Sequence, residues 1–184
     1  MDWSTKWQIF IDKISTDNYN NNYMKMLGNG LLVTVKIAVL GLLIGIVIGT
    51  LIAACKVAPK YKLFIRILDK VCTVYTAFFR GTPIMVQLLL AYYVLLPMLG
   101  VRGVNPENVG VIIFGLNSGA YVSEIMRGGI KSVDVGQMEA GRALGLSYPV
   151  TMLKIVIPQA IKNILPTLGN EFITLIKETS VLSF

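Results

Sequence analysis

Two long runs without a charged residue constrain what this chain can fold into. The first covers residues 37–55 and the second covers residues 81–101. A helix needs about 20 predominantly apolar residues to cross a bilayer, so each run is long enough for one crossing. Charged residues make up 15% of the chain, well below the roughly 25% that is typical of soluble domains. The sequence therefore predicts an all-α integral membrane protein and excludes a soluble one-domain enzyme.

A stripe of small residues marks the first predicted span, residues 31–55. This span follows a polar segment, residues 1–26, which we expect to lie outside the membrane, and it opens the membrane domain at residues 27–184. Small residues recur there at every fourth position: Gly41, Gly45, Gly49 and Ala53. Such residues share one helix face and allow a second helix to approach closely. The pattern predicts a packed helix without identifying its partner.

The second span follows a basic segment. We predict an amphipathic helix over residues 61–79, a break at residues 80–83 and a span over residues 84–99. The break is expected because Pro83 disfavours helical backbone at the residue before it and suits the start of a new helix. One continuous helix kinked at Pro83 is the alternative.

Two further apolar segments bring the predicted number of spans to four. The third span covers residues 111–126. The fourth begins at Ile155 and contains Pro158 and Pro166 together with charged residues, so we expect it to be interrupted. Broken helices at membrane depth persist where they are buried in protein or line a wet cavity.

The distribution of basic residues predicts the topology. Residues 56–80 contain six Lys or Arg residues and residues 127–154 contain four, whereas the connection between the second and third spans contains only Arg102. Because cytoplasmic loops are enriched in Lys and Arg, the two basic connections are expected in the cytoplasm and the N terminus outside. This asymmetry also accounts for the net charge of +7, so a nucleic-acid partner is not expected.

The connection after the third span contains a short helix between two turns. Asp134 is placed to cap its N terminus, with Gln137 as the reciprocal partner. The helix is expected over residues 138–144, and Gly145 is expected to end it in a left-handed conformation. Its small side chains would let it lie in a groove of another protein. An ordinary amphipathic surface helix is the alternative.

This segment resembles the EAA loop of permease subunits in ABC importers. The resemblance covers residues 139–158 with every spacing kept, although Gly141 stands in place of the second alanine and Ile157 in place of a leucine. Further blocks are similar to the polar amino acid (histidine/glutamine-type) permeases: residues 79–83 with Gln87, residues 117–121 with Glu124, residues 127–130, and residues 165–166, 169–172 and 177–180. Together these blocks extend over about residues 28–180.

The resemblance implies a type I ABC importer permease, a helical bundle in the bacterial cytoplasmic (inner) membrane with a cytoplasmic coupling helix. Such a subunit has no catalytic residue, metal or cofactor of its own, because ATP and Mg are bound by partner ABC ATPase subunits. The other expected partners are an extracytoplasmic amino-acid-binding protein, a second permease copy or homologous permease, and membrane lipid. The residues expected to contact the ATPase are Glu139, Ala140, Gly141 and Gly145.

Polar residues within the spans are the candidates for the substrate pathway. Glu124 is the foremost, because an acid at membrane depth is a functional hypothesis by default and its carboxylate suits an α-ammonium group. Its alternative role is a local ion pair with Arg127, three residues along the same helix. The remaining candidates are Asn117, Ser118 and Tyr121, for which helix packing is an equal interpretation, together with Gln87, Asn170 and Glu171. Asn170 and Glu171 interrupt the fourth segment, where transporters often place unwound helix. Arg80 is expected to anchor the break to lipid phosphates, with a substrate carboxylate as the alternative.

The similar permeases continue past residues 177–180 into a further membrane helix. We therefore expect this chain to lack the final helix of that family, which has five spans. An intramembrane enzyme is disfavoured, since the chain has no His and no suitably spaced Ser/Lys or Asp pair. A non-transporting scaffold or channel, and a permease for a different small solute, remain the alternatives. The transported amino acid and the composition of the pore are not predicted.

Overall fold

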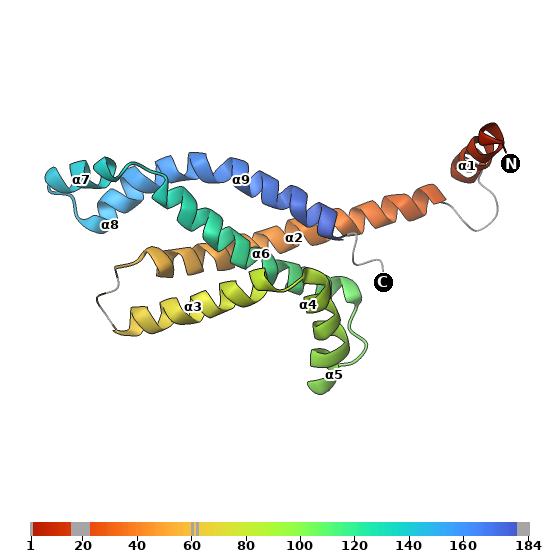
Figure 1. Cartoon of the computed structure of the whole chain (residues 1–184), viewed down its shortest axis with the longest axis horizontal. Coiled ribbons are helices and arrows are strands. Elements are labelled where there is room, and N and C mark those ends of the chain that lie inside the picture. Colours follow the sequence, from red (N-terminus) through yellow and green to blue (C-terminus); the bar gives the residue numbers. More distant parts are fainter. Residues whose placement is uncertain (1, 16–22, 60, 62, 180–184) are drawn as a thin grey trace. The chain divides into compact units, whose positions relative to one another are not determined.

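The computed structural model describes residues 2–15, 23–59, 61 and 63–179. Helices and the turns between them account for these residues, and no strand occurs among them (Figure 1). The chain forms two compact units, Met1–Lys36 and Ile37–Phe184. The all-α prediction is therefore confirmed.

The first unit contains helix α1, Trp3–Ser15, and the beginning of α2, Tyr23–Val57. No helix was predicted over residues 3–15, and the asparagine-rich stretch, residues 18–22, lies outside the described residues. The apolar part of α2 begins at Lys25, earlier than the expected start at residue 31. Two glycines in these first turns cost only about 1 kcal/mol each relative to alanine, which is too little to stop a long helix.

In the second unit, α2 packs against α6, Pro106–Lys131. The predicted stripe of small residues makes this contact. A Cβ atom at Gly45 would lie 2.6 Å from Ser118 Oγ, and one at Gly49 would lie 2.7 Å from Val122 Cβ. Small residues of α6 make room for α2 in the same way, since a Cβ at Gly115 would lie 2.7 Å from Ile44 Cγ2. The prediction of a closely packed helix is confirmed, and its partner is α6.

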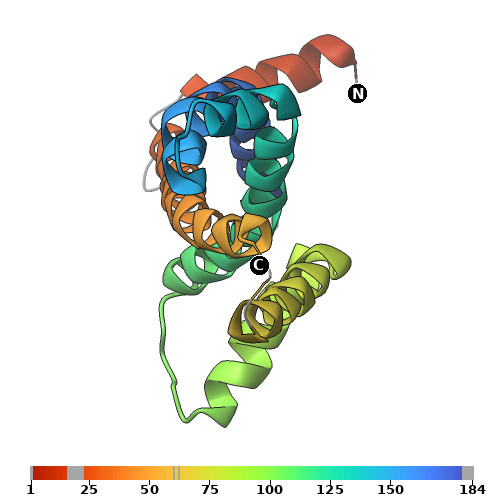
Figure 2. The same cartoon turned by 90° about the vertical axis from the view of Figure 1, so that its left-hand side faces the viewer.

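The predicted break after residue 80 is also present. Helix α3 ends at Gly81, α4 starts at Ile84, and the chain bends by 103° between them. The alternative of one continuous helix kinked at Pro83 is therefore wrong. The elements of this arm are α3 Leu63–Gly81, α4 Ile84–Leu90, a π-helical turn η1 Ala91–Leu95, and α5 Leu96–Met98. Viewed end-on, the arm lies outside the group formed by α2, α6 and α9 (Figure 2).

The C-terminal part of the second unit returns along α6. Its elements are α7 Val135–Ala143, α8 Tyr148–Thr151, a π-helical turn η2 Met152–Val156, and α9 Ile157–Glu178. Helix α9 is continuous, so the expected interruption is wrong. Pro158 falls in the first turn, where a proline needs no hydrogen-bond donor, and Pro166 lies inside the helix. Packing along α6 offsets the hydrogen bond that Pro166 removes.

The number of helices that can cross a membrane by length and composition is smaller than the predicted four. Among the described residues, Lys25–Val57 and Pro106–Lys131 qualify alone, and α3 with α4–α5 qualifies as one bent pair. Helix α9 does not qualify, because Lys162, Glu171 and Lys177 interrupt its apolar residues.

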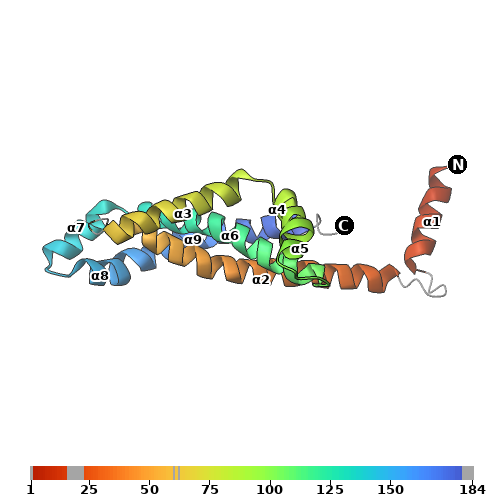
Figure 3. The same cartoon turned by 90° about the horizontal axis from the view of Figure 1, so that it is seen from below.

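Helices α7 and α8 lie at the opposite end of this unit from α4 and α5 (Figure 3). The C terminus of α2 and the N terminus of α3 lie at the same end as α7 and α8 (Figure 1). The end of α2, the start of α3 and the segment of α7 and α8 therefore share one end of the unit, whereas Arg80, counted in the first basic connection, follows α3 to its other end, and Lys60 and Lys62 lie outside the described residues.

Candidate functional site

Helix α7 is closed at both ends by local hydrogen bonds. The Asp134 carboxylate accepts a 2.7 Å hydrogen bond from the Gly136 backbone N–H, which confirms the predicted N-cap. At the other end Gly145 has φ +80°, and the amides of Gly145 and Leu146 donate to the carbonyl oxygens of Arg142 and Gly141. This pair of bonds is the Schellman arrangement, which uses the last carbonyl groups of a helix. The predicted left-handed end is confirmed.

The predicted reciprocal partner of the cap is wrong. The Gln137 side chain turns away from Asp134 and accepts a 3.0 Å hydrogen bond from Gln159 Nε2 of α9. This bond ties α7 to α9. The helix also begins at Val135, three residues earlier than expected, because the cap at Asp134 starts the helical backbone directly after itself.

Helix α7 packs on the rest of the unit through one buried face, and its other faces are exposed to solvent. Gly141 is its buried residue, and a Cβ there would overlap the methyl group of Thr151, which is fully buried. Glu139 and Ala140 are exposed, and Leu144, directly after the helix, is 80% exposed. The small residue at Gly141 therefore allows α7 to lie flat on α8 and η2 while Glu139 and Leu144 project outward.

A charged cluster joins α2, α3 and α6 toward the same end of the unit. Lys56 Nζ lies 2.8 Å from Glu124 Oε1 and donates to Thr76 Oγ1 at 3.1 Å. Arg127 donates to Glu124 Oε2 through both Nε and Nη2, at 3.1 and 2.5 Å. Both oxygens of Glu124 are thus occupied by cations. A polar cavity of about 280 Å³ adjoins the cluster, and its lining also includes Asp69, Thr73 and Lys131.

A second polar group holds the bend between α3 and α4. Gln87 Nε2 donates to the carbonyl oxygens of Phe79 and Thr82 at 2.9 and 3.0 Å. Asn117 Nδ2 of α6 donates to Phe79 O and to Gln87 Oε1, both at 3.1 Å. The end of α3 exposes carbonyl groups that have no partner within the helix, and these two amide side chains satisfy them.

The other predicted pathway residues differ in how far their side chains are buried. Ser118 is completely buried, and its hydroxyl forms no hydrogen bond among the described residues, although Glu171 of α9 lies beside it. Tyr121 is partly exposed, and the Arg80 guanidinium lies 5.4 Å from its ring centroid. Asn170 is exposed and Glu171 is half-buried on a regular stretch of α9. Unwound backbone at these two residues was expected, and that expectation is wrong.

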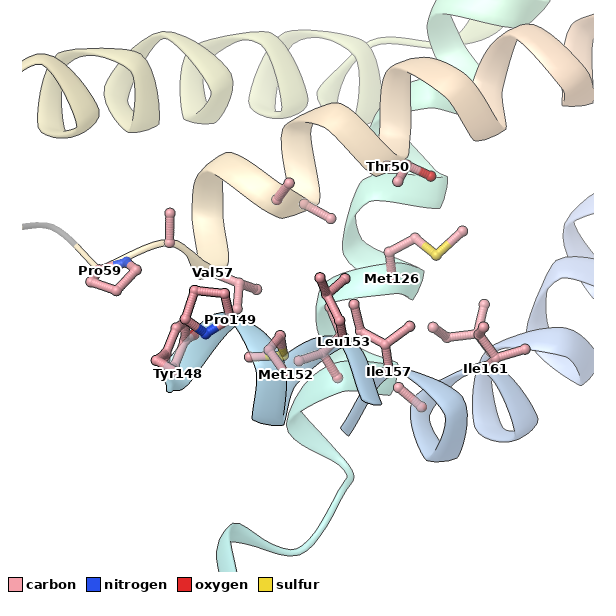
Figure 4. Close-up of a pocket in the computed structure, with 16 residues that line it drawn as sticks. Thr50, Val57, Pro59, Met126, Tyr148, Pro149, Met152, Leu153, Ile157 and Ile161 are labelled. Atoms are coloured by element: carbon pink, nitrogen blue, oxygen red, sulfur yellow. The ribbon is translucent and has the colours of Figure 1, made fainter. Parts of the chain in front are cut away.

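An apolar cavity of about 460 Å³ lies between the end of α2 and the helices that follow α7 (Figure 4). Val57 comes from α2, Met126 from α6, and Met152 and Ile157 from η2 and α9. The cavity borders the same C-terminal elements that seat α7. A movement of α8, η2 or the start of α9 relative to α2 would change its volume.

Comparison with known proteins identifies the family. The family described as binding-protein-dependent transport system inner membrane component matches residues 41–184. The chain belongs to this family.

Relatives of this inner membrane component include several transport permeases. A protein named as a glutamine transport system permease of Rickettsia prowazekii is 46% identical over 84% of this chain and 68% of its own length. The arginine transport system permease protein ArtQ of Bacillus subtilis is 42% identical over the same shares. The L-cystine transport system permease protein TcyB of Bacillus subtilis is 36% identical, over 92% of this chain and 70% of its own length.

Solved structures agree with the fold of this inner membrane component. A crystal structure of an amino acid ABC transporter with histidines has a TM-score of 0.80 and 37% identity, over 100% of this chain and 76% of that chain. An inward-facing MetNI methionine ABC transporter has a TM-score of 0.70 at 17% identity, over 89% of this chain and 76% of that chain. The second similarity concerns the fold alone. These matches confirm the predicted bundle of the type I ABC importer permease kind.

The structure of this inner membrane component also shows contacts that sequence reasoning missed. Lys56 was counted only as a basic loop residue, yet it neutralises Glu124. Its position directly after the uncharged run of α2 was the available signal, since a lysine there can reach back into the helix packing. Thr151 packs against Gly141, and nothing in the sequence pattern indicated this contact.

Proposed function

We propose that this chain is the membrane-spanning subunit of an ATP-driven importer that translocates a polar amino acid across the bacterial cytoplasmic membrane. The observation that carries the proposal is α7, a helix capped at both ends, seated through Gly141 and open to solvent at Glu139 and Leu144. The similarity to permeases named for glutamine, arginine and cystine transport supports the substrate class.

Coupling to separate ABC ATPase subunits occurs through this helix, within residues 139–158. A groove on the ATPase takes the exposed side of α7, where Glu139 offers a charge and Ala140 offers little bulk. Because Gln137 bonds to Gln159, a displacement of α7 is transmitted to α9 and from there to α6. ATP and Mg are bound by the ATPase, and this chain contributes no catalytic group.

The orientation in this proposal has the N terminus outside and α7 in the cytoplasm. The Lys and Arg residues at the end of α2, in the first two turns of α3 and between the end of α6 and η2 support it. An extracytoplasmic binding protein delivers the amino acid at the other end. A second copy of this chain, or a homologous permease, completes the pathway.

Within this frame the pathway residues divide into two groups. Gln87, Asn117, Ser118 and Glu124 have buried or fully paired side chains, so their proposed role is to hold α2, α3, α4 and α6 in position. Tyr121, Asn170 and Glu171 retain accessible surface and are the proposed contacts for the amino acid. Arg80, above the Tyr121 ring, supplies a cation for the substrate carboxylate.

The test is purification of the chain from its native membrane in mild detergent, with partners identified by mass spectrometry. A stoichiometric ABC ATPase is expected, and it should be lost from the Glu139→Lys variant. The control is Asn108→Lys, which adds a lysine at an exposed position in the first turn of α6, at the end of that helix away from α7. Recovery of intact chain without an ATPase would overturn the proposal and favour a scaffold or channel.

Substrate class requires a second measurement. The assembled complex, placed in vesicles with ATP enclosed and binding protein outside, is expected to accumulate labelled glutamine, arginine or histidine. ATP-dependent uptake of a different small solute, with none of an amino acid, would refute the substrate assignment and leave the coupling role intact.

A further inference from the structure

We infer that α1 is an interfacial helix that lies on the membrane surface with its aromatic face in the lipid headgroup region. The helix has 13 residues, and the four apolar side chains Trp3, Trp7, Phe10 and Ile11 fall on one face of it by their spacing. All four are exposed: Trp3 by 79%, Trp7 by 55%, Phe10 by 52% and Ile11 by 45%. In water such a face would be unfavourable.

Local contacts order the first turns of α1. Asp2 accepts a 2.8 Å hydrogen bond from the Trp3 backbone N–H and a 3.2 Å bond from the Ser4 hydroxyl, so the first turn is capped. Trp7 and Phe10 stack with their ring centroids 5.4 Å apart. Trp7 and Phe10 therefore form one aromatic surface, one helical turn from Trp3, on a helix that begins with its own cap.

The position of α1 in the chain favours lipid as the occupant of this surface. Seven residues, 16–22, connect α1 to α2, whose apolar span begins at Lys25. A connection of that length reaches at most roughly 25 Å, so α1 is held near the membrane at all times. Tethering of this kind raises the effective concentration of the bilayer surface around α1.

The chemistry of the face also fits the interface between lipid and water. Tryptophan is enriched there because its ring is apolar while its N–H group can bond to polar groups. Lys6 lies three residues from Trp3 and four from Phe10, at the edge of the aromatic face, where its ammonium group can meet lipid phosphate. The side of the helix away from this face carries Thr5 and Gln8, with Ile9 as its apolar exception.

The tryptophans provide the test without any label, because the chain has two and both lie in α1. The full chain is reconstituted into vesicles of phosphatidylcholine and phosphatidylglycerol, with and without bromine on the acyl chains. The tryptophan emission is expected to be blue-shifted. Brominated lipid should quench most of this emission, and aqueous acrylamide should quench little of it. Emission typical of water, quenched by acrylamide, would overturn the inference.

Two charge-matched variants separate lipid from protein as the occupant. Phe10→Asp places a carboxylate on the aromatic face and should shift the emission to the red and restore quenching by acrylamide. Ile9→Asp places the same charge on the opposite side and should leave both readouts unchanged. Protection from acrylamide without quenching by brominated lipid would show that the face packs on protein, such as a second copy, and would also overturn the inference.

Discussion

Lys56 Nζ of α2 lies 2.8 Å from Glu124 Oε1 of α6, in a cluster where the two side chains keep only 10% and 20% of their surface exposed. The helices meet through small residues, so their backbones approach closely over most of their contact. The ion pair adds a directional contact at one end of that packing. Removing Glu124 leaves Lys56 and Arg127 poorly solvated without their carboxylate, which costs more than the intact pair contributes, whereas removing Lys56 leaves Glu124 paired with Arg127 alone.

Glu124→Gln is expected to lower the free energy of unfolding by about 2–3 kcal/mol, less than for a fully buried pair because part of the site is accessible to water. Thermal unfolding in detergent measures this. Lys56→Met should lower it as well, and the double variant should recover part of the loss. Additive losses would mean that the two residues do not interact. Glu139→Gln, at an exposed acid on α7, is the control.

Gly49→Leu is expected to separate α2 from α6, because even a Cβ at this position would lie 2.7 Å from Val122 Cβ. Overpacking of this kind costs about 3 kcal/mol, so the yield of folded protein should fall sharply. Gly30→Leu is the matched control in the same helix, because nothing lies within 4 Å of a Cβ there. Equal yields for the two variants would contradict the close packing.

Gln87→Leu is expected to loosen the bend between α3 and α4. The substitution removes donors to the carbonyl oxygens of Phe79 and Thr82, and unpaired buried polar groups cost about 1–3 kcal/mol. Spin labels at the exposed positions Val74 and Val94 measure the distance across the bend, and its distribution should broaden. Gln8→Leu on α1 should leave it unchanged. A distribution as narrow as in the parent protein would assign the bend to Pro83 alone.

Gly145→Ala is expected to weaken association with the ATPase while leaving the rest of the fold intact. Its φ of +80° costs a residue with a Cβ about 1–2 kcal/mol, and this strain falls on the end of α7. The amount of ATPase that co-purifies measures the effect. Gly103→Ala imposes similar strain at φ +73° in the loop before α6. An equal loss for both variants would show that global stability, and not α7, controls association.

Sequence patterns alone determined much of this architecture. Periodic small residues predicted the close packing of α2, Asp134 and Gly145 predicted both ends of α7, and Pro83 predicted the bend. Each of these rests on local backbone preferences or on residue size, which operate within one or two helical turns and so can be read along the chain. The resemblance of residues 139–158 to the EAA loop likewise depends only on spacing.

Tertiary structure decided what those elements do to one another. In the packed structure α2 contacts α6, and Glu124 is paired with both Lys56 and Arg127. Helix α9 also stays helical through Pro166. Tertiary structure also turned Gln87 and Asn117 toward the bend. These outcomes depend on side chains far apart in the sequence, such as Lys56 and Glu124, whose meeting is set by the packing of whole helices. Local preference carries no information about which distant groups will share a low-dielectric site, because that energy exists only once the helices are packed.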